Sequence, residues 1–127
     1  MEQYLIDTNI VSDYFSASLP ETGLLFLDGI IDAIPILSVI TQIELLCWNT
    51  NKTIEHWVEC FVADSIIMDI TPDIVRKCVT IRKGKKIKTP DAIIAATALT
   101  NNLTLITNNV KDFNWIPDLK IKNPYNL

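Results

Sequence analysis

The sequence contains little cysteine, histidine and glycine, and no apolar run approaches the roughly 20 residues that cross a bilayer. It has three cysteines (Cys47, Cys60 and Cys78) without a CxxC pair, and one histidine, His56. These residues are not spaced as a zinc set, so we expect reduced thiols buried among apolar helix residues. The chain does not start with a basic region and a cleavable apolar stretch, which predicts a cytoplasmic protein.

The composition predicts one folded domain over residues 1–127. Of the 127 residues, 49% are hydrophobic and 20% are charged, and no repeat or Gly/Ser-rich linker divides them. A net charge of −4 argues against a protein that coats nucleic acid through bulk charge. However, five of the eleven basic residues fall in one short stretch: Arg82, Lys83, Lys85, Lys86 and Lys88.

Hydrophobic periodicity and capping residues predict strands that alternate with helices. Strands are expected at 3–7, 36–38, 65–70, 103–107 and 119–121. Helices are expected at 9–15, 21–33, 39–48, 54–62, 72–82 and about 91–100. The first is started by Thr8 or Asn9, and the last two follow the helix starts Thr71-Pro72-Asp73 and Thr89-Pro90-Asp91. Asn101 and Asn102 are expected to end the last helix, and a polar turn is expected after residue 107. The stretch around Gly84 is expected to be a loop. Such alternation is typical of an α/β protein, here a three-layer α/β/α fold with a parallel sheet of four to five strands.

Four acidic residues occupy positions that require an explanation. Asp7 ends the first strand, Glu44 lies in an apolar helix, Asp91 begins an Ala-rich helix, and Asp112 follows the strand that ends at Thr107. Each has an ordinary alternative: Glu44 can face solvent, Asp91 can favour the helix dipole, and Asp112 can be a loop acid. In a parallel sheet, however, the carboxyl ends of the strands share one edge, where functional clefts lie.

Carboxylates gathered in one cleft repel one another and raise each other's pKa, and a divalent cation removes that conflict. Oxygen ligands without nearby cysteine or histidine favour Mg²⁺ or Mn²⁺. Such ions activate water and stabilise charge on a phosphodiester. The basic stretch at 82–88 would then bind phosphates, although by itself it is also consistent with a solvated loop.

Four segments together resemble the PIN-domain ribonucleases. They are LIDTNIVSDYF at 5–15, SVITQIELL at 38–46, TPDAIIAATAL at 89–99 and LTLITNNVKDF at 103–113. They occur in the order found in that family and extend over nearly the whole chain. The short single-domain form is similar to the toxins of VapBC-type toxin–antitoxin pairs.

This resemblance implies an Mg²⁺- or Mn²⁺-dependent endoribonuclease. Asp7, Glu44 and Asp91 match the main metal-binding and catalytic acids of the family, and the fourth site residue is Asp112 or Asn109. Supporting polar positions match Asn9 and Thr107, and Ser38 is a candidate hydrogen-bonding residue. The resemblance also implies an RNA substrate, a homodimer and a small antitoxin protein as partner.

Other functions fit parts of the sequence. A haloacid-dehalogenase-like phosphatase also has an aspartate at the end of its first strand, but its second aspartate would stand where this chain has Asn9. A non-catalytic module that binds RNA or a protein is a second alternative. An RNA-processing PIN-like nuclease without an antitoxin is a third.

Overall fold

The computed structural model describes residues 2–127 and contains a five-stranded parallel sheet. The strands are β1 (Tyr4–Ile6), β2 (Ile36–Ser38), β3 (Ile66–Met68), β4 (Thr104–Ile106) and β5 (Ile121–Lys122). Their order in the sheet is β3-β2-β1-β4-β5, and all four neighbouring pairs are parallel. The α/β prediction with a parallel sheet of four to five strands is therefore confirmed.

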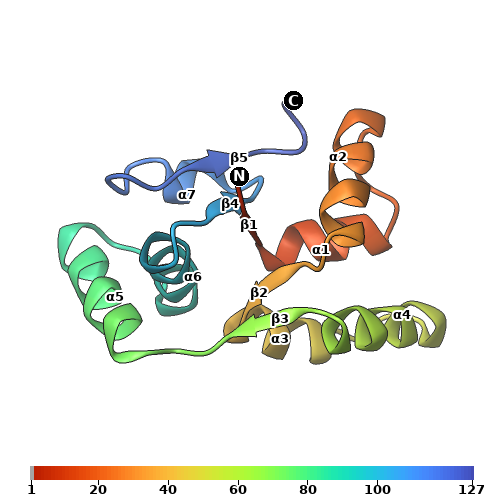
Figure 1. Ribbon diagram of the computed structural model, residues 1–127, viewed down its shortest axis with the longest axis horizontal. Helices are drawn as coiled ribbons and strands as arrows, with labels where there is room; N and C mark the ends of the chain where they lie inside the picture. The colour runs from red at the N-terminus through yellow and green to blue at the C-terminus, as the bar shows by residue number, and fades with distance from the viewer. Residues whose placement is uncertain (1) are drawn as a thin grey trace.

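Helices cover both faces of the sheet. They are α1 (Thr8–Phe15), α2 (Glu21–Asp32), α3 (Val39–Leu46), α4 (Lys52–Ala63), α5 (Pro72–Gly84), α6 (Thr89–Thr100) and α7 (Val110–Phe113). Figure 1 shows α5 and α6 on one side of the sheet and α1, α2 and α4 on the other. This arrangement is the predicted three-layer α/β/α fold.

The apolar residues of the central strands divide between two cores because successive side chains of a strand point to opposite faces. One core, shared with α5 and α6, contains Leu5, Ile36 and Leu105. The other, shared with α1, α2 and α4, contains Ile6, Leu37 and Ile106. All six side chains are buried. Strands buried on both faces explain why these segments lack an apolar–polar alternation.

Several predicted boundaries differ from the structure. The first helix begins one residue earlier than expected, because the side chain of Asp7 accepts a hydrogen bond from the Thr8 amide and caps α1. The predicted polar turn after β4 contains the short helix α7. As expected, Asn101 and Asn102 end α6; Asn102 has a left-handed φ of 52°, which asparagine tolerates.

The basic stretch is only partly a loop, so that prediction is corrected. Arg82, Lys83 and Gly84 form the last turn of α5, where basic side chains complement the negative end of the helix dipole. Only residues 85–88 connect α5 to α6. The Nε of Arg82 donates a hydrogen bond to the Ile87 carbonyl oxygen at 3.3 Å, which ties the connection to the end of α5.

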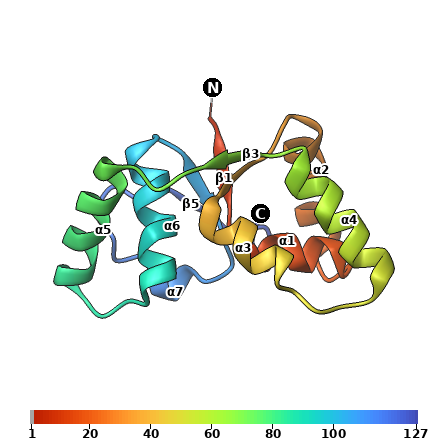
Figure 2. The same ribbon diagram turned by 90° about the horizontal axis from the view of Figure 1, so that it is seen from below.

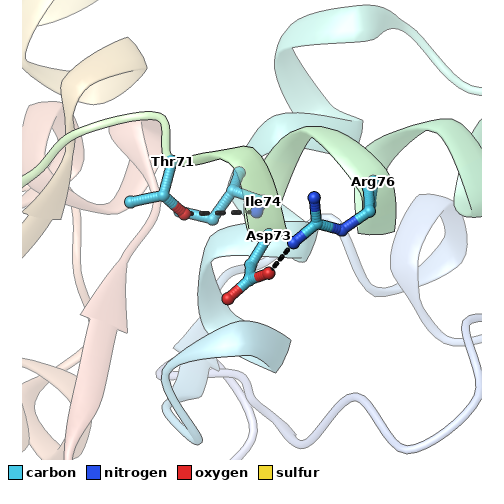
Figure 3. Close-up of polar contacts among 4 residues, drawn as sticks. All are labelled: Thr71, Asp73, Ile74 and Arg76. Atoms are coloured by element: carbon cyan, nitrogen blue, oxygen red, sulfur yellow. Dashed lines mark hydrogen bonds and ion pairs between the residues drawn. The ribbon is translucent and has the colours of Figure 1, made fainter.

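At the opposite end of α5, the helix begins with a side-chain cap (Figure 3). Thr71 Oγ1 accepts a hydrogen bond from the Ile74 amide at 3.3 Å, and Pro72 occupies the first helical position. Arg76 pairs with Asp73 on the exposed face of the same turn (Figure 3). The Thr-Pro-Asp start predicted from the sequence is therefore a real helix start, and Arg76 is engaged within α5.

The expectation that all three thiols are buried is wrong for two of them. Cys78 is buried on α5, whereas Cys47 and Cys60 are exposed. Helix α4 buries Val58, Phe61 and Val62, so Cys60 lies on the other side of the same helix. In the described part of the chain, no helix is long and apolar enough to cross a membrane.

Two glycines of α2 provide a matched test of the packing between this helix and the C-terminal segment. A Cβ at Gly23 would overlap the carbonyl oxygen of Pro124, whereas a Cβ at Gly29 would meet nothing within 4 Å. We expect Gly23→Ala to lower the free energy of unfolding by about 1–3 kcal/mol through overpacking. Gly29→Ala should raise it by about 0.5–1 kcal/mol, because alanine has the higher helix propensity.

Urea unfolding of the two variants measures this difference. Both substitutions add the same methyl group to the same helix, so the difference between them isolates the contact with Pro124. Equal stability changes for Gly23→Ala and Gly29→Ala would show that Pro124 does not restrict α2.

Candidate active site

Asp7 lies at the carboxyl edge of the sheet and contacts the residue that ends the neighbouring strand. Asp7 follows β1, and Thr107 follows β4, which pairs with β1 in parallel. Thr107 Oγ1 donates a hydrogen bond to Asp7 Oδ2 at 2.8 Å, and the Thr8 amide donates to Asp7 Oδ1 at 2.9 Å. Asp7 is only 5% exposed and Thr107 is fully buried. The sheet register therefore brings Thr107 to one carboxylate oxygen, and the start of α1 holds the other.

The environment of Asp7 disfavours its charge. Burial raises the pKa of its carboxyl group from 3.8 to about 6, although the hydrogen bonds from Thr107 and Thr8 oppose this change. The negative charges of Asp91 and Glu44 also contribute to this higher pKa. Three predicted acids thus influence one another electrostatically at this edge of the sheet.

Glu44 reaches the edge from α3 through a contact that the sequence did not reveal. Its exposed carboxylate accepts a hydrogen bond from Thr8 Oγ1 at 2.6 Å. The Thr8 hydroxyl oxygen also lies 3.0 Å from Oγ1 of Thr41, which is fully buried. Glu44 is therefore exposed to solvent and still lies close to Asp7, because its partner Thr8 follows Asp7 directly in the chain.

The other two acids come from α6 and α7. Asp91, in the first turn of α6, is partly buried. Burial is the main cause of the raised pKa of its carboxyl group, and the negative charges of Asp112 and Glu44 also raise it. Asp112, on α7, accepts a hydrogen bond from the Asn109 side-chain amide at 2.9 Å. The Asn109 backbone amide donates to Thr107 Oγ1 at 3.0 Å. One hydrogen-bonded chain therefore runs from Asp7 through Thr107 and Asn109 to Asp112.

The kinds of ligand present fit a hard divalent cation, although their oxygens do not converge. In residues 2–127, no three Asp, Glu, His or Cys side chains are grouped closely enough to ligate one ion. Like charges repel, so convergence of four carboxylates on one point requires a cation. The two ion pairs found in this part of the chain are Arg76–Asp73 and Lys122–Glu2, and neither neutralises these acids. Oxygen ligands without sulfur or nitrogen suit Mg²⁺ or Mn²⁺.

A pocket of about 550 Å³ joins two of these acids to the basic stretch. Asp91 and Asp112 contribute to its wall. Its basic lining residues are Arg82, Lys85, Lys86, Lys88 and Lys111. The α5–α6 connection, the start of α6 and α7 lie at the same end of the molecule in Figure 2. Lys83, which was expected in the basic group, is exposed but does not line the pocket.

Three residues of this region were missed by sequence reasoning: Thr8, Lys111 and Trp115. Thr8 was considered only as a helix start, and no local pattern connects it to Glu44. Lys111 and Trp115 flank Asp112 in a segment predicted to be a polar turn. Their proximity to the basic stretch depends on packing between segments about 30 residues apart.

Ser38 and Asn9, two of the predicted supporting residues, take part in the helix starts of α3 and α1. Ser38 is fully buried, and its Oγ accepts a hydrogen bond from the Ile40 amide at 3.1 Å, so it caps α3. Asn9 lies exposed in the first turn of α1. Ser12 Oγ donates to the Asn9 carbonyl oxygen at 2.9 Å. Asn9 therefore does not start the helix, which begins after Asp7.

Comparison with known families and structures gives a consistent result. The sequence profile of the PIN domain matches residues 4–117. A toxin–antitoxin complex from Klebsiella pneumoniae contains a chain that is 34% identical, with a TM-score of 0.76 over 98% of this chain and 100% of that chain. VapBC2 from Rickettsia felis, bound to a promoter DNA fragment, has 25% identity and a TM-score of 0.77 over 94% of this chain and 97% of that one.

A curated relative is similar over a shorter segment. Ribonuclease VapC2 of Rickettsia felis is 45% identical over 42 residues, which make up 33% of this chain. The match spans 31% of the length of that protein. The structures thus extend the similarity to nearly the whole chain, and the curated match adds a segment of higher identity.

Proposed function

Because the chain belongs to the PIN-domain family, we propose that it is an Mg²⁺- or Mn²⁺-dependent endoribonuclease and the toxin of a toxin–antitoxin pair. The observation that carries the proposal is Asp7, a buried carboxylate at the end of β1 whose pKa is raised to about 6. A group this unfavourable in its charged form is typical of a functional site. The hydrolysis of RNA also agrees with the name of the curated relative, Ribonuclease VapC2.

In this proposal, Asp7, Asp91 and Asp112 hold the metal ion, and Glu44 orients the attacking water. When bound, the ion supplies an activated water and neutralises charge on the phosphate. Thr107 keeps the Asp7 carboxylate in place through its 2.8 Å hydrogen bond. Thr8 donates to one carboxylate oxygen of Glu44 and holds this residue beside Asp7. The second carboxylate oxygen of Glu44 is then available for a water molecule.

The basic side chains hold the RNA backbone. Lys85, Lys86, Lys88 and Lys111 line the pocket that Asp91 and Asp112 help to form, so phosphates bound there lie next to the acids. Arg82 supports the α5–α6 connection through its hydrogen bond to Ile87 and adds a fifth positive charge. The overall charge of −4 then restricts RNA binding to this pocket, away from the rest of the surface.

The proposed protein partners are an antitoxin and a second copy of the chain. Exposed apolar side chains on α2, Leu24 and Leu25, offer a surface for the antitoxin, and Ile43 and Leu46 on α3 offer one for a homodimer. The mass of the purified chain in solution tests the dimer. Co-purification with the product of an adjacent reading frame tests the antitoxin; an RNA-processing nuclease would lack this partner.

We place the activity in the cytoplasm. The three cysteines are free, and two of them are exposed, which suits a reducing compartment. Fractionation of cells that express the chain tests this localisation, and recovery outside the cytoplasm would contradict it.

The purified chain should cleave single-stranded RNA in the presence of Mg²⁺ or Mn²⁺ and lose that activity in EDTA. The assay uses a labelled RNA and, in parallel, a phosphomonoester. Hydrolysis of the phosphomonoester alone would favour the phosphatase alternative. RNA binding without cleavage under every metal condition would favour a non-catalytic module.

A further inference from the structure

Trp115 places a flat aromatic surface in the pocket beside the acids. The side chain is half-buried, and its indole Nε1 donates a hydrogen bond to the Asp112 carbonyl oxygen at 2.8 Å. A Cβ added at Gly84 would lie 3.9 Å from Trp115 Cζ3, so the ring also approaches the end of α5. The hydrogen bond at Nε1 and packing against the core shared with α5 and α6 limit rotation of the indole, and the aromatic surface is therefore preorganised.

The charge around this ring suits a nucleotide. Lys85 Nζ lies 5.7 Å from the centre of the Trp115 ring, within the range of a cation–π contact. Lys86, Lys88 and Lys111 line the same pocket. An aromatic surface for a base, together with lysines for the backbone, is the combination found in proteins that bind single-stranded nucleic acid. A volume of about 550 Å³ falls within the range of small-molecule sites.

We propose that this pocket binds one unpaired nucleotide of the RNA substrate, with its base stacked on Trp115 and its phosphate held by Lys85 and Lys86. The proposal rests on the proposed nuclease function and adds a specific subsite to it. The nucleotide must be unpaired, because a base within a duplex has both faces covered by its neighbours. As the base arrives, it takes the place of Lys85 on the ring, and the freed ammonium group turns to the phosphate.

The same ring connects base binding to the acidic residues. Trp115 is hydrogen-bonded to the backbone of Asp112, so a base on the ring is held at a fixed position relative to that acid. The basic lining and the two acids occupy one pocket. Phosphates are repelled from the acids and attracted by the lysines, which orients the RNA backbone across the pocket. Trp115 is therefore a positioning residue that selects single-stranded substrate.

Binding measured in EDTA tests the subsite without requiring cleavage. The probe is a fluorescent single-stranded RNA of about nine nucleotides, within the site sizes of such proteins. Trp115→Leu should weaken binding by roughly five-fold to 150-fold, since one base stack contributes about 1–3 kcal/mol. Trp115→Phe retains an aromatic ring and should stay within about three-fold of the unmodified protein. Trp57→Leu, on α4, is the matched control and should bind normally.

A series of RNAs, each with one abasic position, identifies the stacked nucleotide. The unmodified protein should bind one of these RNAs more weakly, the one whose abasic position removes the stacked base. Trp115→Leu should bind that RNA and the intact RNA with equal affinity. Normal binding by Trp115→Leu, or no RNA binding by the unmodified protein, overturns the subsite. If RNA binds through Trp115 but is never cleaved with metal, the nuclease proposal fails and the subsite stands. If RNA is cleaved while Trp115→Leu binds normally, only the subsite fails.

Discussion

Replacing Asp7 with asparagine is expected to reduce metal-dependent RNA cleavage by at least about 100-fold while the protein becomes more stable at neutral pH. The loss follows because asparagine cannot supply the negative charge that a divalent cation requires. The gain follows because the Asp7 carboxylate is buried and its pKa is raised to about 6, so its charge opposes folding. Opposite changes in activity and stability are typical of a functional residue that the fold tolerates at a cost.

The pH dependence of stability has a definite sign. With a folded-state pKa of about 6 and an ordinary value of 3.8, protonated Asp7 favours the folded state. Its contribution is fully present below about pH 4 and is lost as the pH rises through about 6. Above that pH, Asp7→Asn should be about 1–3 kcal/mol more stable than the unmodified protein, since one pKa unit corresponds to about 1.4 kcal/mol.

Urea unfolding in EDTA between about pH 4 and pH 8 measures this difference. Glu59→Gln serves as the control, because Glu59 is an exposed acid on α4 outside the pocket. Its stability relative to the unmodified protein should change little over the same pH range. A lower stability of Asp7→Asn at pH 7.5 would contradict the burial argument. If Mg²⁺ stabilises the unmodified protein but does not stabilise Asp7→Asn, this result would support metal binding by Asp7.

The sequence was sufficient to predict which residues of the candidate site lie at strand ends. Asp7 and Thr107 each follow a short apolar strand, and parallel strands present their carboxyl ends at one edge. The 2.8 Å hydrogen bond between these two residues, 100 positions apart, is a direct consequence of this topology. Asp91 was located by a different local signal, because Thr-Pro-Asp is a recognisable helix start.

Contacts that depend on packing between helices were not predictable in this way. Thr8 meets Glu44 because α1 and α3 are held side by side, which no local pattern encodes. Trp115, which follows α7, lines the same pocket as the α5–α6 connection, although the sequence predicted only a polar turn for its segment. The exposed Cys60 shows the same limit: an apolar neighbourhood in sequence does not fix which side of a helix faces the core.

Asp112, the fourth acid, is expected to have the second large effect on RNA cleavage. Asp112→Asn should reduce cleavage by about 100-fold, whereas Asn109→Ala should reduce it by about ten-fold. Of Asp112 and Asn109, only Asp112 carries a charge. That charge raises the pKa of Asp91, so Asp112 acts electrostatically on the other acids of the site. Asn109 instead holds other groups: its side chain donates to Asp112, and its backbone donates to Thr107. We therefore propose Asp112 as the metal ligand and Asn109 as a positioning residue.

A double variant that exchanges the two residues, Asn109→Asp with Asp112→Asn, separates these roles. The exchange keeps the total charge and the amide–carboxylate pair but moves the carboxylate by three positions. If the position of the charge matters, the exchanged protein should be as inactive as Asp112→Asn and should require more Mg²⁺ for half-maximal cleavage. Cleavage rates over a Mg²⁺ titration measure both effects. Full activity of the exchanged protein would instead identify position 109 as the fourth ligand site, because the acid at 109 would then be the one that completes the set with Asp7 and Asp91.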